Sequence, residues 1–169
     1  LYLNNKNGTF TKITSGAIVN SGGWGSGCSW GDYDNDGWLD LFVTNNGGTP
    51  NFLYRNNHNG TFTRILNSPI GTTISHSFGC NWGDYDNDGD LDMVVNNIDD
   101  EVLVYRNKTT DDKKNHWVSL KLEGNKENIN AVGAKVVVFT NNEVQLYEKQ
   151  PVRGFQSSME IPLHIGLGS

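Results

Sequence analysis

The eight residues WGDYDNDG occur at Trp30–Gly37 and again, letter for letter, at Trp82–Gly89. Three of the eight are aspartates at alternate positions, which in the first copy are Asp32, Asp34 and Asp36. Three carboxylates this close repel one another, and the repulsion destabilises the folded chain unless a cation lies between them. The stretch therefore indicates both an internal repeat and a cation site.

The repeat extends well beyond these eight residues. A shift of 52 residues aligns Tyr2–Ile13 with Tyr54–Ile65, and Gly27–Asn45 with Gly79–Asn97. A third, partial copy begins with VLVYRN at Val102–Asn107. Self-similarity at a fixed period of about 20 to 50 residues indicates a repeat architecture.

Each copy predicts about four short antiparallel strands. The segments LDLFVTN and LDMVVNN are brief apolar runs, rich in β-branched residues and bounded by Gly, Asn and Asp, as strands are. Asn7–Gly8 and Asn59–Gly60 predict tight hairpins, because a two-residue turn needs positive φ at both positions. A repeated four-stranded sheet is a propeller blade, so the predicted fold class is all-β. We expect about two to three blades in an incomplete ring, because a propeller typically has about four to eight.

Oxygen ligands recur at fixed positions of both loops. Counting from Asp32 and Asp84 as position 1, carboxylates occupy positions 1, 3, 5 and 9, glycine occupies position 6, and position 7 offers its backbone carbonyl. Such a loop suits Ca²⁺, which accepts about six to eight oxygen ligands, better than Mg²⁺, which keeps several waters. The absence of soft or imidazole ligands argues against a transition metal. The predicted ligands are Asp32, Asp34, Asp36, Trp38 and Asp40 in the first loop and Asp84, Asp86, Asp88, Asp90 and Asp92 in the second.

Neither loop is an EF-hand. That motif begins in the same way but needs flanking helices and a glutamate at position 12, where this chain has Val43 and Val95 inside apolar strands. A solvated acidic turn is the alternative, but two identical copies at a fixed period favour the metal. At position 7, Trp38 has no side-chain oxygen, so we expect its counterpart Asp90 to point its carboxylate outward.

Residues 1–107 resemble FG-GAP/VCBS repeats, the blades of integrin-type and related bacterial propellers. In that family the loop Asp-x-Asp-x-Asp-Gly-x-x-Asp joins the first two strands of a blade and holds Ca²⁺. Both loops match this motif at every position. The resemblance implies one Ca²⁺ in each loop, two sites in all, with a role in fixing the loop and not in chemistry.

The period is lost after Asn107. Residues 108–115 predict a charged linker, and residues 116–169 predict a small β domain with a strand at His116–Gly124 and a hairpin at Val132–Gln150 that turns at Asn141–Asn142. This domain resembles a truncated ASPIC/UnbV domain, whose activity is poorly defined, and it lacks the Arg-Trp-Pro-like run with which members usually continue. The resemblance is carried by Asn115–Trp117, Gly133–Val136 and His164–Gly168.

Two pairs of residues repeat with the copies and predict the packing between them. Cys28 and Cys80 are expected to be buried and unpaired, because facing sheets pack about 10 Å apart and a disulfide needs Cα atoms within about 7 Å. Trp30 and Trp82 are expected in the core.

The sequence does not support a catalytic site. Gly27–Gly31 fits the pattern G-x-S-x-G, but a nucleophile elbow needs a strand–turn–helix context, and Asn81 replaces the serine in the second copy. The four histidines have no metal-ligand spacing and are expected to be surface or packed residues. Neither cysteine has a cationic or histidine partner nearby in the sequence.

Charge and composition argue against some classes of binding partner. A net charge of −6 and a pI near 5.0 disfavour nucleic acid and anionic membrane surfaces. No apolar run reaches the roughly 18 residues of a membrane span. The chain opens on LYLNN, which reads as a strand already in progress, so we take it to be a piece of a longer protein whose missing targeting signal is uninformative.

These features favour a Ca²⁺-stabilised propeller segment, extracellular, cell-surface or periplasmic, that serves adhesion or protein–protein interaction without catalysis. Its expected partners are a protein or a glycan, and the remaining blades of a longer chain or other copies of this chain. One alternative is a glycan-binding propeller, since Trp24 and Trp38 lack a tryptophan in the other copy and could stack on a sugar. Another is an accessory domain of a larger secreted enzyme. N-glycosylation sequons begin at Asn7, Asn59 and Asn107.

Overall fold

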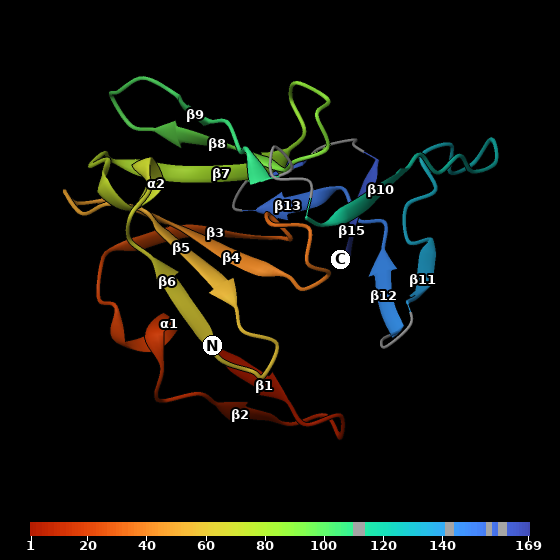
Figure 1. Ribbon diagram of the computed structural model, residues 1–169, viewed down its shortest axis with the longest axis horizontal. Helices are drawn as coiled ribbons and strands as arrows, with labels where there is room; N and C mark the ends of the chain where they lie inside the picture. Colours follow the sequence, from red (N-terminus) through yellow and green to blue (C-terminus); the bar gives the residue numbers. More distant parts are fainter. Residues whose placement is uncertain (110–113, 141–143, 155–156, 159–161) are drawn as a thin grey trace.

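The computed structural model describes residues 1–109, 114–140, 144–154, 157–158 and 162–169. Nearly all regular structure in these residues is β-strand, and the two helices, α1 (Ala17–Asn20) and α2 (Pro69–Thr72), are single turns. The strands pair antiparallel in several separate sheets, as Figure 1 shows. This arrangement confirms the predicted all-β class with an incomplete, propeller-like set of sheets.

The first full sheet is a blade of four strands. They are β3 (Gly25–Gly31), β4 (Asp40–Asn45), β5 (Phe52–Asn56) and β6 (Phe62–Ile65). Neighbours in the sheet are neighbours in the sequence, and each pair is antiparallel. Leu41 on β4 faces Trp30 on β3 and Tyr54 on β5. The meander predicted for one copy is therefore confirmed.

The second sheet repeats this register with one strand fewer. Its strands are β7 (Ser77–Gly83), β8 (Asp92–Asn97) and β9 (Leu103–Tyr105). Met93 faces Trp82 and Tyr105 as Leu41 faces its partners in the first sheet. The expected fourth strand is not part of this sheet among the described residues. His116 and Trp117, which lie one repeat after the end of β6, belong instead to a strand that pairs with the chain terminus.

A hairpin at the start of the chain matches the outer half of a blade. Its strands are β1 (Tyr2–Asn4) and β2 (Phe10–Lys12), one repeat before β5 and β6. The predicted hairpins form, but not with two-residue turns. Positive φ occurs at Lys6 and Gly8, and the N–H of Asn5 donates to the carbonyl of Thr9 across the longer loop. Asn7 instead accepts a hydrogen bond from the Thr9 N–H through its side chain, which explains an asparagine without positive φ.

The main core lies between the β3–β6 sheet and the β7–β9 sheet, and Trp82 is central to it. The indole ring sits edge-on to Phe42 at 6.1 Å, and its N–H donates to the Ser29 carbonyl at 3.3 Å. A methyl group on Gly31 would overlap the Trp82 ring, so glycine permits this close approach of β3 and β7. The buried residues of this core are Phe42, Leu53, Cys80, Trp82, Leu91, Met93 and Val95.

Two packing predictions are wrong for the first copy. Cys80 is buried and Trp82 is 6% exposed, whereas Cys28 is exposed and Trp30 is 42% exposed. Both cysteines are free, as expected. The reason for the difference is the neighbour on each sheet: β7 packs against β3, whereas the matching face of β3 carries no further blade among the described residues. Of the two tryptophans considered for stacking on a sugar, Trp24 is exposed, whereas Trp38 is half-buried.

The C-terminal part forms small two-stranded sheets. They pair β10 (His116–Leu120) with β15 (Leu163–Gly168), β11 (Lys135–Phe139) with β12 (Val144–Glu148), and β13 (Val152–Gly154) with β14 (Ser157–Ser158). The predicted hairpin is confirmed by the pairing of β11 with β12, and its predicted turn at Asn141–Asn142 lies outside the described residues. The boundaries 1–107, 108–115 and 116–169 stay predictions.

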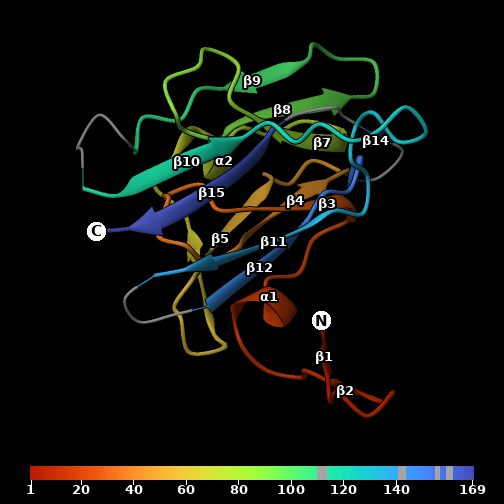
Figure 2. The same ribbon diagram turned by 90° about the vertical axis from the view of Figure 1, so that its right-hand side faces the viewer.

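We call the strands β10 to β15 the C-terminal unit. It lies at one end of the β3–β6 and β7–β9 sheets. Figure 1 shows that unit on the right, beside the end at which β3 and β7 finish, and Figure 2 views it face on. β13 contacts both β3 and β7. The unit therefore spans the two sheets at the end where the acidic loops begin.

The burial difference between the two tryptophans predicts unequal effects on stability. Trp82→Ala should lower the free energy of unfolding by about 3 to 5 kcal/mol, because it empties a packed core site. Trp30→Ala should have a much smaller effect, since its ring is already 42% exposed. Urea denaturation of both variants measures this, and equal losses would contradict the packing described here.

Candidate metal centre

Each acidic loop joins the first two strands of its sheet and is closed by its own backbone. The carboxylate of Asp32 accepts the N–H groups of Asp36 at 3.0 Å and Gly37 at 2.9 Å. Asp84 in the second loop accepts the corresponding N–H groups of Asp88 and Gly89 at 3.1 and 3.2 Å. The position-1 aspartate therefore folds the chain back on itself, and the identical sequences give the same local geometry.

The aspartate at position 9 ties each loop to the next strand of its sheet. The two oxygens of Asp40 accept the N–H groups of Asn56 at 2.8 Å and Tyr33 at 3.1 Å. Asp92 is bound in the same way by the N–H groups of Asn107 and Tyr85. Both position-9 side chains are fully buried, so they anchor the loops to the sheets.

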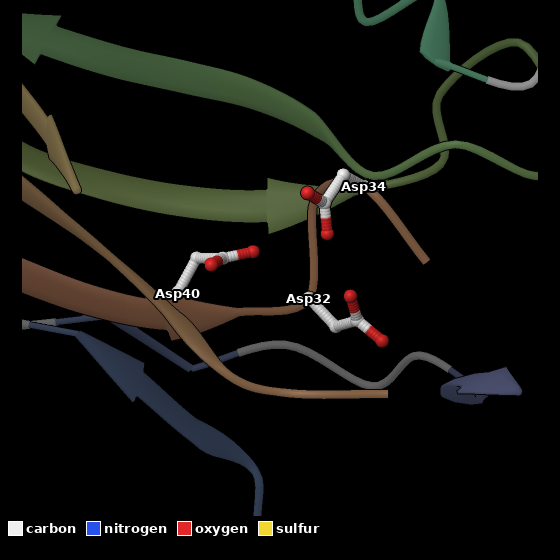
Figure 3. Close-up of side chains that lie close together, drawn as sticks. All are labelled: Asp32, Asp34 and Asp40. Atoms are coloured by element: carbon white, nitrogen blue, oxygen red, sulfur yellow. The ribbon is translucent and has the colours of Figure 1, made fainter. Parts of the chain in front are cut away.

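The carboxylates of each loop converge on one point. In the first loop Asp32, Asp34 and Asp40 each offer an oxygen within 4.8 Å of the others, and Figure 3 shows them around a common space. In the second loop the group is Asp84, Asp86 and Asp88, so its third member comes from position 5 instead of position 9, and the predicted ligand Asp92 lies outside it. These are acidic clusters that could hold a metal ion.

One oxygen in each loop lacks a donor. The Oδ1 atoms of Asp34 and Asp86, both at position 3, are buried and have no hydrogen-bond partner among the described residues. A buried carboxylate oxygen without a partner is costly, so these two oxygens are available to a cation. Oxygen-only donors on a tight loop fit Ca²⁺.

Without a metal, the carboxyl groups of the first loop have raised pKa values. Burial raises the pKa of Asp32 to about 7, that of Asp34 to about 6 and that of Asp40 to about 8. Neighbouring carboxylates, Asp36 among them, raise these pKa values further. A divalent cation would favour the charged form of all three.

Basic side chains approach position 5 in both loops. The Nε2 atom of His58 lies 2.7 Å from Asp36 Oδ2, and the imidazole stacks on Trp38 with ring centroids 5.2 Å apart. Asp36 thus lies outside the carboxylate cluster of its loop. In the second loop, Arg106 contacts Asp86 at 2.7 Å and Asp88 at 3.1 Å.

The expected outward orientation of Asp90 is wrong. Its side chain is fully buried, and its Oδ1 accepts a hydrogen bond from Asn35 Nδ2 at 3.2 Å. The same amide donates to the Gly89 carbonyl at 3.1 Å. Asp90 is buried because the two loops lie against each other, which the sequence of one loop does not reveal. Coordination through the position-7 carbonyls of Trp38 and Asp90 stays a prediction.

Two further residues matter at this site and were missed from the sequence. Asn35 at position 4 is fully buried, and His164 near the chain terminus bonds to it. Burial lowers the pKa of His164 to about 4, so the imidazole is neutral. The asparagine between two ligand positions was the only local signal. The expectation of a packed histidine is confirmed at His164.

The serine of the G-x-S-x-G pattern lies inside a strand. Ser29 is buried within β3, and the chain continues from β3 directly into the first acidic loop. The strand–turn–helix context of a nucleophile elbow is therefore not found at this position.

Comparisons with known proteins agree with this geometry. The model of the FG-GAP-like repeat family matches residues 1–43 and 32–95, which together are more than half of the chain. The ASPIC and UnbV model matches residues 124–169. No curated protein and no solved structure matched. Within the described residues, no helix is long and apolar enough to cross a membrane.

The raised pKa values predict how stability depends on pH. In the presence of a chelator, the folded protein binds protons at Asp32, Asp34 and Asp40 more tightly than the unfolded chain does, which stabilises the fold. This stabilisation is complete below pH 3.8, the ordinary pKa of aspartate. It is lost as pH rises through the folded-state pKa values of about 6 to about 8. Melting temperature should therefore fall between pH 5 and pH 8 in chelator. With excess Ca²⁺ it should rise, because the metal needs ionised ligands. A rise in both conditions would contradict this assignment.

Proposed function

We propose, because this chain belongs to the FG-GAP-like repeat family and ends in an ASPIC/UnbV domain, that it is a Ca²⁺-stabilised segment of an extracellular β-propeller. It serves adhesion or protein–protein interaction and has no catalytic role. The observation that carries the proposal is the pair of buried, unpartnered oxygens on Asp34 and Asp86. A buried carboxylate oxygen without a donor can bind a cation, and each loop has one.

The donor set selects the ion. Every predicted ligand is a carboxylate or a backbone carbonyl, which suits a hard cation. Each loop brings three carboxylates together, and Ca²⁺ tolerates irregular geometry better than Mg²⁺ does. Two bound Ca²⁺ ions change the formal charge of the chain from −6 to −2 and remove the repulsion within each loop.

The role of the site is to fix the ends of the strands. Bound Ca²⁺ supplies positive charge that lets the buried carboxylates ionise. The chain itself does the rest: Asp32 holds the turn, and Asp40 connects the loop to β5 through the Asn56 N–H. The loop between β3 and β4 thereby sets the alignment of three strands of the blade.

An apolar groove on the first blade offers an interaction surface. The side chains that line it include Leu1, Ile18, Cys28, Trp30, Leu41 and Val43. Its counterpart on the second blade, around Cys80 and Trp82, is covered by the first blade. The groove thus continues an interface already present once in the molecule, so we assign to it a further sheet of the same repeat type.

Calcium titration tests the metal assignment. Isothermal calorimetry of the 169-residue protein should count two sites, and Asp86→Ala should abolish one of them. Asp90→Ala is the matched variant within the same loop. It should keep both sites, because only its backbone oxygen binds, but it should lose about 1 to 3 kcal/mol of stability through the broken Asn35 bond. Equal losses of affinity in the two variants would refute the ligand assignment.

Thiol reactivity tests the interaction surface. In the protein as described, Cys28 should react with an alkylating reagent far faster than Cys80. A copy of residues 21–52 placed before Leu1 supplies the two inner strands that β1 and β2 lack. With the cysteine in that copy changed to serine, Cys28 should become as slow as Cys80. A polar linker of equal length is the control. An unchanged Cys28 rate would exclude this occupant.

A further inference from the structure

The two acidic loops have the same residue at every position but 7, yet they differ in their surroundings. Asn35 is fully buried, whereas Asn87 at the same position of the second loop is exposed. Their backbones agree, with φ of 57° and 60°. The difference therefore comes from what packs on the first loop and not from the loop itself.

The C-terminal unit packs on the first loop. His164 Nε2 on β15 lies 2.6 Å from Asn35 Oδ1, and the Gly168 N–H donates to the Asn35 carbonyl at 3.0 Å. One residue earlier in the loop, the side-chain amide of Asn115 donates to the carbonyl of Asp34 at 2.7 Å. Two of these bonds, from Gly168 and from Asn115 just before β10, thus hold the backbone of Asp34 and Asn35, and the third, from His164, holds the Asn35 side chain.

The direction of these bonds is determined. The side-chain amide of Asn35 donates to the Gly89 carbonyl and to Asp90 Oδ1 in the second loop, so its oxygen is the acceptor for His164. His164 therefore donates through Nε2–H. Asn35 is the residue at which the first loop, the second loop and the C-terminal unit meet.

Close packing supports the same contact. A methyl group on Gly166 of β15 would overlap Asp32 Oδ2 and the backbone of Asn35. Trp117 of β10 lies over Gly89 in the second loop and stacks on His164 with ring centroids 5.5 Å apart. The β10–β15 sheet therefore covers the loops and excludes water from one side of Asp32.

We propose that the first loop is a Ca²⁺-dependent lock between the repeats and the C-terminal unit, with Asn35 as the positioning residue. Both Ca²⁺ binding and docking of the β10–β15 sheet require the backbone around Asp34 and Asn35 to be ordered. Whichever binds first pays the entropy of ordering this backbone, so the second binds more favourably. Such coupling is reciprocal: the docked sheet raises the Ca²⁺ affinity of the first loop, and Ca²⁺ strengthens docking. This inference rests on the proposed Ca²⁺ binding.

Hydrogen exchange of the full chain tests the lock. Ca²⁺ should slow amide exchange in β15, residues 163–168, relative to chelator. Asp86→Ala leaves only the first site and should keep this protection, whereas Asp34→Ala leaves only the second and should lose it. In the Asp86→Ala background, Asn35→Gly should abolish the protection and weaken Ca²⁺ binding by about 5- to 150-fold.

The identical loop provides the control. Asn87→Gly removes the same side chain at the same positive φ, which glycine tolerates, and it should leave the protection of β15 intact. If Asn35→Gly fails to fold, His164→Ala, which lies outside both loops, should give the same loss. Equal behaviour of the two asparagine variants, or unchanged β15 exchange in a protein that binds two Ca²⁺, overturns the lock alone. No Ca²⁺ binding at all overturns the proposed function with it.

Discussion

The close spacing of carboxylates in each acidic loop is the constraint on which the rest of the molecule depends. The chain satisfies Asp32 and Asp40 with its own N–H groups, but it leaves an oxygen of Asp34 buried and without a donor. While these carboxylates are ionised, such an arrangement is costly unless a cation lies among them. Because each loop joins the inner strands of a sheet, the same ion that we propose for the loop also stabilises the blade.

Packing of the first sheet against the second depends on the close approach of β3 and β7. Gly31 lets the Trp82 ring approach β3, and the Ser29 carbonyl receives the indole N–H. The corresponding ring of Trp30 has no such cover in the described chain and stays 42% exposed. A repeated residue therefore has the same strand position in both copies, but its burial is set by the sheet that lies next to it.

The same rule applies to the loops. Position 4 is asparagine in both, yet Asn35 connects three parts of the molecule while Asn87 is exposed. The C-terminal unit reaches only the first of these positions, because β15 passes over Asp32 and Asn35. Two loops with the same six residues at positions 1 to 6 are thus inequivalent. The side chain that contacts position 5 differs as well: it is His58 in one loop and Arg106 in the other.

The sequence by itself determined the features that depend on local spacing. The repeat, the strands and the carboxylate positions follow from alternation, turn residues and the interval between aspartates, which act within a few residues. It did not determine the exposure of Cys28 and Trp30, the burial of Asp90, or the joining of Asn35 to His164, 129 residues away. Only the tertiary structure decided these, because burial and long-range hydrogen bonds depend on which surface packs opposite, and that surface lies in another copy or in the C-terminal unit.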